Sequence, residues 1–297
     1  MAYDPIHHPV LAREVVEWLR ASTGGLFVDC TLGLGGHTRA LLDAGASRVI
    51  AIDRDQTAIG IARERLGPLA ARVETVHADY RALPALLDQR GVERVQGVLA
   101  DLGVSSMQFD AEGRGFSFRR DDPLDMRRDQ SARPTAADLV NQADEGELAD
   151  VIFRFGEERY SRRIARAIVA ARPIATTGAL AAIVRRAVPT RGWQRIDPAT
   201  RTFQALRIWV NGELEKLDDF VAHAADRLEP GGRLAVISFH SLEDRIVKHT
   251  MRGLADQVPG AFRVLTKKPV TASDEEVTAN PRARSAKLRV GEHPVAG

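Results

Sequence analysis

Three glycines and an acid near the amino end of the chain have the spacing of a nucleotide-binding turn. Residues 26–37 read LFVDCTLGLGGH, in which an apolar run precedes Gly33, Gly35 and Gly36. Glycine allows a positive φ and a close approach of backbone to ligand, and the first N–H groups of the next helix can bind it. Asp53 ends a second apolar run about 20 residues later, where such units place the acid that binds ribose hydroxyls. This stretch predicts a nucleoside site; the alternative is an ordinary turn with a chance acid.

The turn departs from the dinucleotide fingerprint. That fingerprint reads G-x-G-x-x-G, but here Thr38 occupies the last position and Asp29 lies ahead of the turn. A carboxylate beside the turn repels a pyrophosphate and attracts a cationic group. S-adenosyl-L-methionine carries an ammonium and a sulfonium group, so we expect it as the cofactor in preference to NAD. A nicotinamide-dependent oxidoreductase on a similar sheet is the alternative function.

A parallel sheet is needed to position these residues. Apolar runs alternate with amphipathic segments, and acids follow the first four runs at Asp29, Asp53, Asp79 and Asp101. In an open parallel sheet the carboxyl ends of the strands form the ligand-binding edge. The pattern predicts an α/β, Rossmann-like fold with a mostly parallel sheet. The seven expected strands cover residues 26–30, 48–53, 72–77, 95–102, 233–239, 262–265 and 287–290.

The alternation stops between residues 103 and 203. A crossover between parallel strands needs only one helix, and a bare loop of about a hundred residues is improbable. We therefore expect an inserted helical domain in residues 109–205, within a cofactor-binding domain formed by residues 1–108 and 206–297. After an irregular segment rich in Arg, Asp and Gly, helices are expected near 145–155, 158–171 and 178–188. The arginines of residues 159–172 form either a solvated face or a phosphate-binding surface.

Local patterns predict where several helices begin. Thr135 with Asp138, and Ser241 with Asp244, fit the capping box, and Asp55 can cap a third helix. Residues 198–228 read as one helix, with Pro198 in its first turn.

Composition excludes several classes of protein. The 297 residues include 44% hydrophobic and 28% charged side chains, which is typical of a globular chain, and the net charge of +2 gives no general argument for nucleic acid. The single cysteine, Cys30, excludes a disulfide framework and a zinc cluster, and the adjacent His7 and His8 do not make a metal site. No apolar run approaches the ~20 residues that cross a bilayer. We expect a cytoplasmic protein with no membrane partner.

From Asp101 onward the sequence resembles the bacterial ribosomal RNA small-subunit methyltransferase H family. The resemblance covers essentially the whole chain and also includes HPVL (8–11) and TLGLGGHT (31–38). One departure is Met107, where relatives often have Pro. The strings that carry it are DLGVSS (101–106), RGFSFR (114–119), PLDMR (123–127), GEER (156–159), RIARAIV (163–169), PATRTFQALRIWVN (198–211), PGGRL (230–234), SFHSLEDRIVK (238–248) and NPRARSAKLR (280–289).

This resemblance implies a class I methyltransferase fold and an enzyme that makes N4-methylcytidine in the decoding region, at the P site, of 16S ribosomal RNA. It implies that the small ribosomal subunit is the partner and allows a homodimer. A non-catalytic RNA-binding assembly factor with a vestigial pocket is a further alternative. The cofactor contacts that it implies are Gly35, Gly36, His37, Asp53, Tyr80, Asp101 and Gln108.

The catalytic group stays open at this stage. The cytosine amine is weakly nucleophilic because its lone pair is delocalised into the ring, so the site must orient it and accept its proton. Asp101, Ser105, Ser106 and His240 are candidates, although His240 also suits a capping role. Unstacked bases are commonly read by aromatic and Arg side chains. The expected RNA contacts are Arg114, Phe116, Phe118, Arg201, Arg282 and Arg284, with local core and surface ion pairs as the alternative.

Overall fold

The computed structural model describes residues 9–103, 112–189, 196–257 and 260–295. The chain forms two compact units. The first unit comprises residues 1–103 and 216–297, and the second comprises residues 104–215. The boundary expected at residues 205 and 206 falls inside helix α10, whose whole length belongs to the second unit.

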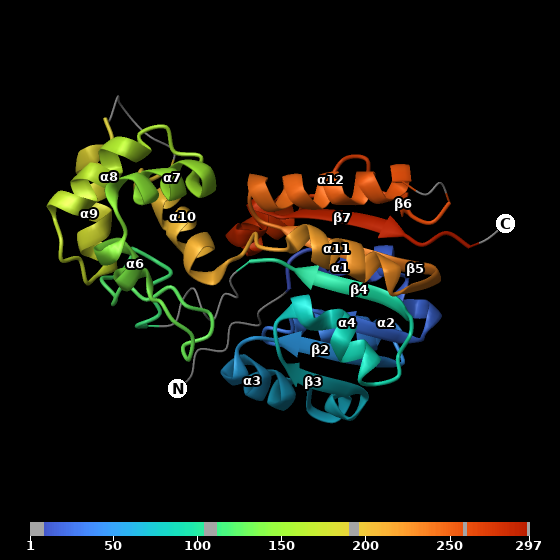
Figure 1. Ribbon diagram of the computed structural model, residues 1–297. Coiled ribbons are helices and arrows are strands. Elements are labelled where there is room, and N and C mark those ends of the chain that lie inside the picture. Colours follow the sequence, from blue (N-terminus) through green and yellow to red (C-terminus); the bar gives the residue numbers. More distant parts are fainter. Residues whose placement is uncertain (1–8, 104–111, 190–195, 258–259, 296–297) are drawn as a thin grey trace. The chain divides into compact units, whose positions relative to one another are not determined.

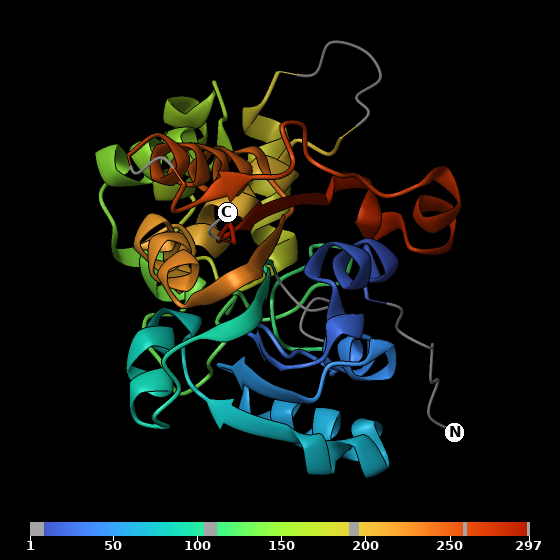
Figure 2. The same cartoon turned by 90° about the vertical axis from the view of Figure 1, so that its right-hand side faces the viewer.

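A single seven-stranded sheet organises the first unit (Figures 1 and 2). Its strand order is β3-β2-β1-β4-β5-β7-β6. The first five strands in this order, β3 to β5, are parallel to one another, whereas β7 is antiparallel to both β5 and β6. The strands are β1 (Leu26–Asp29), β2 (Arg48–Asp53), β3 (Val73–His77), β4 (Val95–Asp101), β5 (Leu228–Ser238), β6 (Arg263–Val264) and β7 (Lys287–Glu292).

All seven strands expected from the sequence are present. The largest difference is at β5, which begins at Leu228 instead of Arg233. Val95 pairs with Leu228 and Gly97 with Arg233, so the turn residues Pro230–Gly232 form a bulge inside the strand. The bulge fits because Gly231 has a φ of 83° and a Cβ on Gly232 would meet two backbone oxygens.

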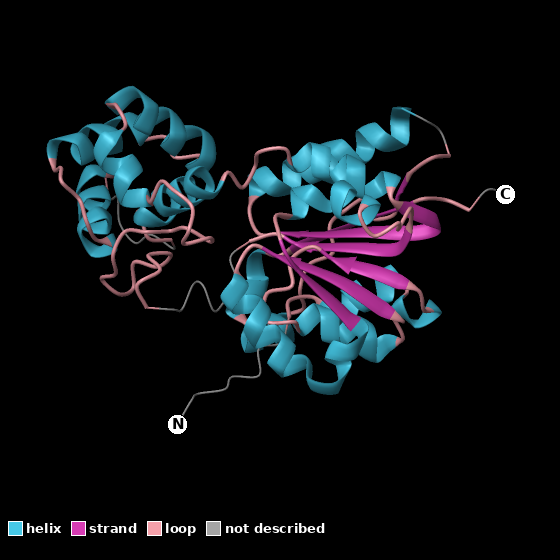
Figure 3. Ribbon diagram, turned by 60° about the horizontal axis from the view of Figure 1, so that its bottom comes forward, coloured by secondary structure: helices cyan, strands magenta, loops and turns pink. Residues whose placement is uncertain are grey.

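Helices pack on both faces of this sheet (Figure 3). The central strands β1 and β4 are therefore almost completely buried, as their uninterrupted apolar runs require, whereas β3 at the edge is only half-buried. The helices of the first unit are α1 (Ala12–Leu19), α2 (Gly36–Ala44), α3 (Gln56–Leu66), α4 (Leu83–Asp88), α11 (Leu217–Asp226), α12 (Ser241–Gln257) and α13 (Asp274–Ala279), with 3-10 turns at Ala21–Thr23, Gly67–Arg72, Tyr80–Ala82 and Pro281–Ser285.

The second unit is helical in the part that the structure describes. Its apolar core joins the irregular segment near Leu124 to the helices that follow. The three helices expected near 145–155, 158–171 and 178–188 are confirmed, and Thr135 and Asp138 form the expected capping box. The helices are α6 (Ala136–Gln142), α7 (Glu145–Gly156), α8 (Ser161–Ala170), α9 (Thr177–Ala187) and α10 (Ala199–Asn211).

Two expectations about helix ends were wrong. Residues 198–228 are two helices, because α10 ends at Gly212 in the left-handed conformation that glycine adopts readily. The start of α12 is capped by His240 and Glu243, one residue before the expected pair. Asp244 instead accepts from Arg289 at 2.6 Å.

No helix in the described ranges is both long and apolar enough to span a membrane.

Candidate active site

The glycine turn between β1 and α2 has the conformation that its sequence requires. Gly33 and Gly35 have φ values of 51° and 80°, in the left-handed region. Among the described residues, a Cβ on Gly33 would meet one atom within 4 Å, an oxygen of its own loop at 3.9 Å, so these residues leave the space beside it open. Gly36 is helical, and its missing side chain leaves room for Pro9, whose ring would lie 3.1 Å from an added Cβ.

Asp53 ties this turn to the end of β2. One oxygen of its carboxylate accepts the Gly33 N–H at 2.7 Å, and the other accepts the Asp55 N–H at 2.9 Å. Asp55 in turn caps α3 through its side chain, as expected. The Asp53 carboxylate is half-buried at the carboxyl edge of the sheet, so it is oriented by the backbone and still reaches solvent.

Asp29 is a structural clamp at the end of β1. It is fully buried, and it accepts hydrogen bonds from the Thr38 hydroxyl at 2.7 Å and from the Thr31 N–H at 3.1 Å. Burial raises the pKa of Asp29, and the opposing effects of His37 and of these hydrogen bonds do not cancel that rise. The threonine that breaks the dinucleotide fingerprint thus fastens α2 to the strand.

His37 and Asp101 form a pair at the same edge, in which the imidazole is buried and the Asp101 side chain is 25% exposed. The His37 side chain is 5% exposed, and its Nε2 lies 3.5 Å from Asp101 Oδ2. Neither imidazole nitrogen, nor Asp101 Oδ1, makes a well-formed hydrogen bond to a described residue, although these atoms are shielded from solvent. Buried polar atoms rarely stay unsatisfied, so these three point to a ligand.

The charge state of His37 is set by its acidic surroundings. Burial by itself lowers the pKa of the imidazole. The carboxylates of Asp101 and Asp29, with a smaller contribution from Glu276, outweigh burial, so the pKa of His37 is raised above its usual value. Asp101 is held in place by its backbone, since its N–H donates to the Thr31 hydroxyl at 2.7 Å.

Tyr80 and Asp79, the two remaining positions at this edge, differ in what surrounds their side chains. Tyr80 is buried, and its ring meets Phe220 edge-on with a centroid distance of 4.6 Å. Asp79 is engaged by Arg81 at 2.6 Å and by Arg54 at 3.3 Å. Burial alone would raise the pKa of Asp79, but its hydrogen bonds to Arg81 and the charge of Arg54 lower it. Asp79 is therefore a capping and ion-pair residue.

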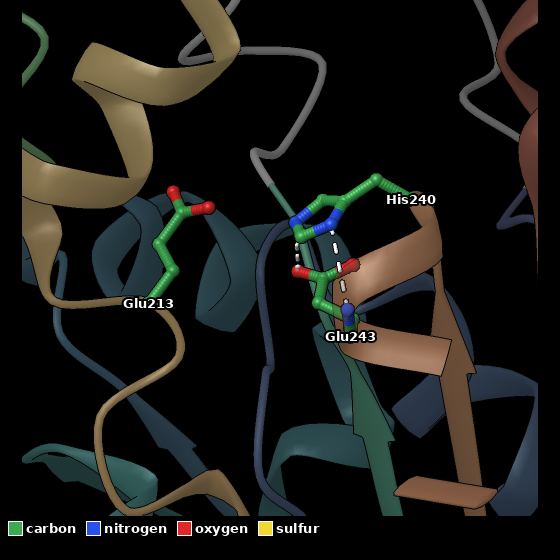
Figure 4. Close-up of side chains that lie close together, drawn as sticks. All are labelled: Glu213, His240 and Glu243. Atoms are coloured by element: carbon green, nitrogen blue, oxygen red, sulfur yellow. Dashed lines mark hydrogen bonds and ion pairs between the residues drawn. The ribbon is translucent and has the colours of Figure 1, made fainter. Parts of the chain in front are cut away.

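Among the catalytic candidates, the structure gives His240 a capping geometry (Figure 4). The Glu243 N–H donates to His240 Nδ1 at 3.4 Å, and His240 Nε2 lies 3.2 Å from the Glu243 carboxylate. Nδ1 thus accepts a capping hydrogen bond, and Nε2, which is buried and makes no well-formed hydrogen bond to a described residue, faces the Glu243 carboxylate. Glu213, also drawn in Figure 4, belongs to the second unit. Ser105, Ser106 and Gln108 lie outside the described residues.

The expected RNA contacts divide into buried and exposed residues. Phe116 is 6% exposed within the core of the second unit. Arg114 donates to the backbone carbonyls of Arg127 and Arg128, so it holds the irregular segment. By contrast, the Arg201 side chain is 54% exposed, although it lies 3.7 Å from Glu158. Arg284 is exposed and Arg282 half-buried; both lie in the 3-10 turn before β7 in the first unit.

Sequence reasoning missed three supports of the site. The first is the contact of Pro9 with Gly36, and the second is the hydrogen bond that the Asp101 N–H donates to the Thr31 hydroxyl. The third is Glu276 of the distant helix α13, whose charge helps to raise the pKa of His37. Only Pro9 could have been found, because it lies within the motif HPVL that the sequence already singled out.

The sheet and its edge define a class of protein. The dinucleotide-binding sheet has the parallel order 3-2-1-4-5-6. Here an antiparallel seventh strand lies between β5 and β6, which is the sheet of the class I methyltransferases. This arrangement confirms the expected fold class and removes the basis for the oxidoreductase alternative.

Comparisons with known proteins identify the family. Residues 4–294 match the MraW methylase family, and the chain belongs to it. It is 53% identical to the ribosomal RNA small subunit methyltransferase H of a Cyanothece species, over 97% of this chain and 94% of that protein. The proteins of the same name from Bradyrhizobium diazoefficiens and Gloeobacter violaceus are 52% and 51% identical, over 96% and 97% of this chain and 91% and 88% of those proteins. The chain is therefore a methyl-transferring enzyme.

Proposed function

We propose that this enzyme transfers a methyl group from S-adenosyl-L-methionine to N4 of a cytidine in the decoding region, at the P site, of 16S ribosomal RNA. The observation that carries the proposal is the unsatisfied His37–Asp101 pair beside the glycine turn and Asp53. It occurs in a methylase whose close relatives are named for the small-subunit ribosomal RNA.

The residues at the sheet edge fit this cofactor. Asp53 is oriented to accept from two ribose hydroxyls, and Gly33 leaves open space beside the turn. The unsatisfied atoms of His37 and Asp101 suit the charged amino-acid end, since an imidazolium can bind its carboxylate and Asp101 its ammonium. Gly35, Gly36, Tyr80 and Gln108 complete the set carried over from the family.

The chemistry needs positioning more than acid–base catalysis. S-adenosyl-L-methionine supplies an electrophilic methyl group on a sulfonium. The protein has to hold the weakly nucleophilic amine in line with that methyl group, accept a hydrogen bond from one of its N–H groups, and take up the proton that the amine loses as S-adenosyl-L-homocysteine leaves. Asp101 has one unsatisfied, shielded oxygen, and the proposal gives that oxygen to the cofactor's ammonium, so Asp101 is not also assigned as the acceptor for the amine. His240 is unsuited, since its lone pair is used in capping.

RNA recognition is assigned to exposed arginines of both units, with the helical unit as the substrate-recognition domain. The target base must leave its stack to reach the methyl group. Arg162 and Arg163 on α8 are exposed, and no acid among the described residues pairs with either one. Arg159 lies over the Tyr160 ring at 4.7 Å, an arrangement that can extend to a stacked base. Arg201, Arg282 and Arg284 are further contacts, whereas Arg114 holds the irregular segment of the second unit and Phe116 lies in that unit's core.

The substrate in this proposal is the small ribosomal subunit in the cytoplasm, with a homodimer as the form to be tested by size-exclusion chromatography with light scattering. The decisive experiment measures transfer of labelled methyl groups to small subunits from cells that lack the modification, followed by mapping of the modified nucleotide. We expect one methyl group on cytidine N4. Binding without transfer would favour the assembly-factor alternative, and a label on another base would refute the cytidine assignment.

A further inference from the structure

The segment Pro9–Leu11 crosses the beginning of α2, next to the glycine turn. An added Cβ on Gly36 would lie 3.1 Å from Pro9 Cδ and Cγ and 3.2 Å from Pro9 Cβ. Such contacts are tight, so any side chain here would require the proline ring to shift by a few tenths of an ångström. The proline ring is thus packed against the first residue of the helix that carries His37.

Leu11 shows that this segment is held in a defined conformation. It is fully buried, yet it has φ 55° and ψ 32°, a left-handed conformation that a leucine rarely adopts. Such a conformation persists only when the surroundings fix it. The Leu11 carbonyl accepts the Val15 N–H, which starts α1, and the Leu11 N–H donates to Glu276 Oε1 at 2.7 Å.

Glu276 comes from α13, a short helix between β6 and β7. Figure 2 shows this dark red region beside the dark blue start of α1. Ser273 caps α13 by accepting the Glu276 N–H, and the neighbouring Ala272 packs on the same apolar cluster as Leu11. Glu276 is half-buried, and its charge also reaches His37, whose pKa it helps to raise. The Glu276 carboxylate therefore bonds to the segment Pro9–Leu11 and also acts on the charge of the His37 imidazole.

We propose that Glu276 is a positioning residue for the methyl donor, which fastens Pro9–Leu11 across Gly36 and thereby holds the glycine turn and His37 in the geometry that binds the cofactor. The proposal rests on the proposed function, because it assumes that S-adenosyl-L-methionine binds at this turn. Its physical basis is preorganisation. A turn that is already ordered loses less conformational freedom on binding, so the ligand binds more tightly.

Three variants test whether the hydrogen bond from Leu11 to Glu276 supports cofactor binding. Glu276→Ala removes both the acceptor and the charge, Glu276→Gln keeps an oxygen that can accept from Leu11, and Glu275→Ala removes an exposed acid from the same helix turn. The probe is S-adenosyl-L-homocysteine, with affinity measured by calorimetry and folding checked by thermal melting. We expect Glu276→Ala to weaken binding about tenfold, the usual cost of losing a hydrogen bond to a charged acceptor. Glu276→Gln should recover part of that loss, and Glu275→Ala should bind like the wild type.

A second measurement follows the imidazole and separates positioning from mere stability. The charged groups that face His37 are Asp101 from β4, Asp29 from β1 and Glu276 from α13. Exposed Arg13 on α1 in turn faces Glu276. Because one of three acids is removed, the pKa of His37, followed by NMR without ligand, should fall in both Glu276 variants and stay unchanged in Glu275→Ala.

The outcomes are distinct. If the wild type does not bind S-adenosyl-L-homocysteine, the proposed function fails. If the wild type binds and Glu276→Ala binds equally well, only the role of Glu276 is overturned. Equal losses in Glu276→Ala and Glu275→Ala would overturn it as well, because the effect would then belong to the charge or stability of α13.

Discussion

Two clusters of charged side chains, one in each unit, differ in how completely their carboxylates are paired. In the second unit, the Glu213 carboxylate is 3% exposed and accepts from Arg128 at 3.1 Å and from Arg207 at 3.0 Å. In the first unit, His37 Nε2 lies 3.5 Å from Asp101 Oδ2, and three shielded polar atoms of this pair make no well-formed hydrogen bond to a described residue. Both oxygens of the Glu213 carboxylate are thus paired, although Arg128 Nε makes no hydrogen bond to a described residue, whereas Asp101 Oδ1 has no such partner.

This difference separates stability from binding. A buried carboxylate with both oxygens paired holds the irregular segment and the end of α10 together, since Asn211 also bonds to Met126 and Arg128. Shielded polar atoms without hydrogen bonds destabilise the folded protein, and a ligand that bonds to them restores that free energy. We therefore expect substitutions in the Glu213 cluster to act on folding and substitutions at the sheet edge to act on cofactor affinity.

The largest effect should come from Glu213→Ala. It leaves two arginines that are only 13% and 19% exposed without their carboxylate, which is expected to lower the free energy of unfolding by about 3–5 kcal/mol. Chemical denaturation measures this change. The control is Glu147→Ala, at an exposed position of α7, and its free energy of unfolding should stay within about 0.5 kcal/mol of the wild type. A loss no larger than that of the control would contradict the structural role of this cluster.

Asp53→Ala should act mainly on binding. Loss of the acceptor for two ribose hydroxyls should weaken S-adenosyl-L-methionine by about 1.5–3 kcal/mol, roughly ten- to a hundredfold. Stability should change less, because Asp53 is half-buried and its bonds are to loop N–H groups. Calorimetry gives the affinity and thermal melting the stability, with Glu64→Ala on the exposed face of α3 as control. Unchanged affinity would remove Asp53 from the cofactor site.

Thr38→Val sharpens the comparison, because the two side chains have nearly the same shape. The variant deprives buried Asp29 of the hydroxyl that donates at 2.7 Å, so the free energy of unfolding should fall by about 1–2 kcal/mol. Cofactor affinity, measured in parallel, should fall only slightly. A large loss of affinity with unchanged stability would move Thr38 from the clamp into the binding site.

The smallest effect concerns pH. Since the pKa of His37 is raised in the folded protein, its contribution to stability is complete below the unfolded pKa of about 6.5 and is lost as pH rises through the higher folded pKa. Denaturation between about pH 6 and about pH 9 should show this decline in the wild type and a flatter profile in His37→Gln. Identical slopes would mean that the imidazole is not held in its charged form.

Much of the fold could be predicted because its patterns are local. The β-prone apolar runs placed all seven strands, and the turn Leu32–Gly36 followed from its glycines. Predictions failed where two local patterns competed. At the start of α12, Ser241 with Asp244 fitted a capping box, but His240 with Glu243 formed the cap because Arg289 on β7 binds Asp244.

By itself, the sequence determined the sheet, the presence of the helical insertion and the acids at the carboxyl edge, since each depends on neighbours within one or two turns of chain. Only the tertiary structure decided what those acids do. Asp29 became a clamp, Asp79 an ion-pair partner, and Asp101 the unsatisfied partner of His37. The role of a carboxylate is set by which donors surround it and how far water is excluded, and those donors come from distant parts of the chain: Glu276 reaches Leu11 across 265 positions.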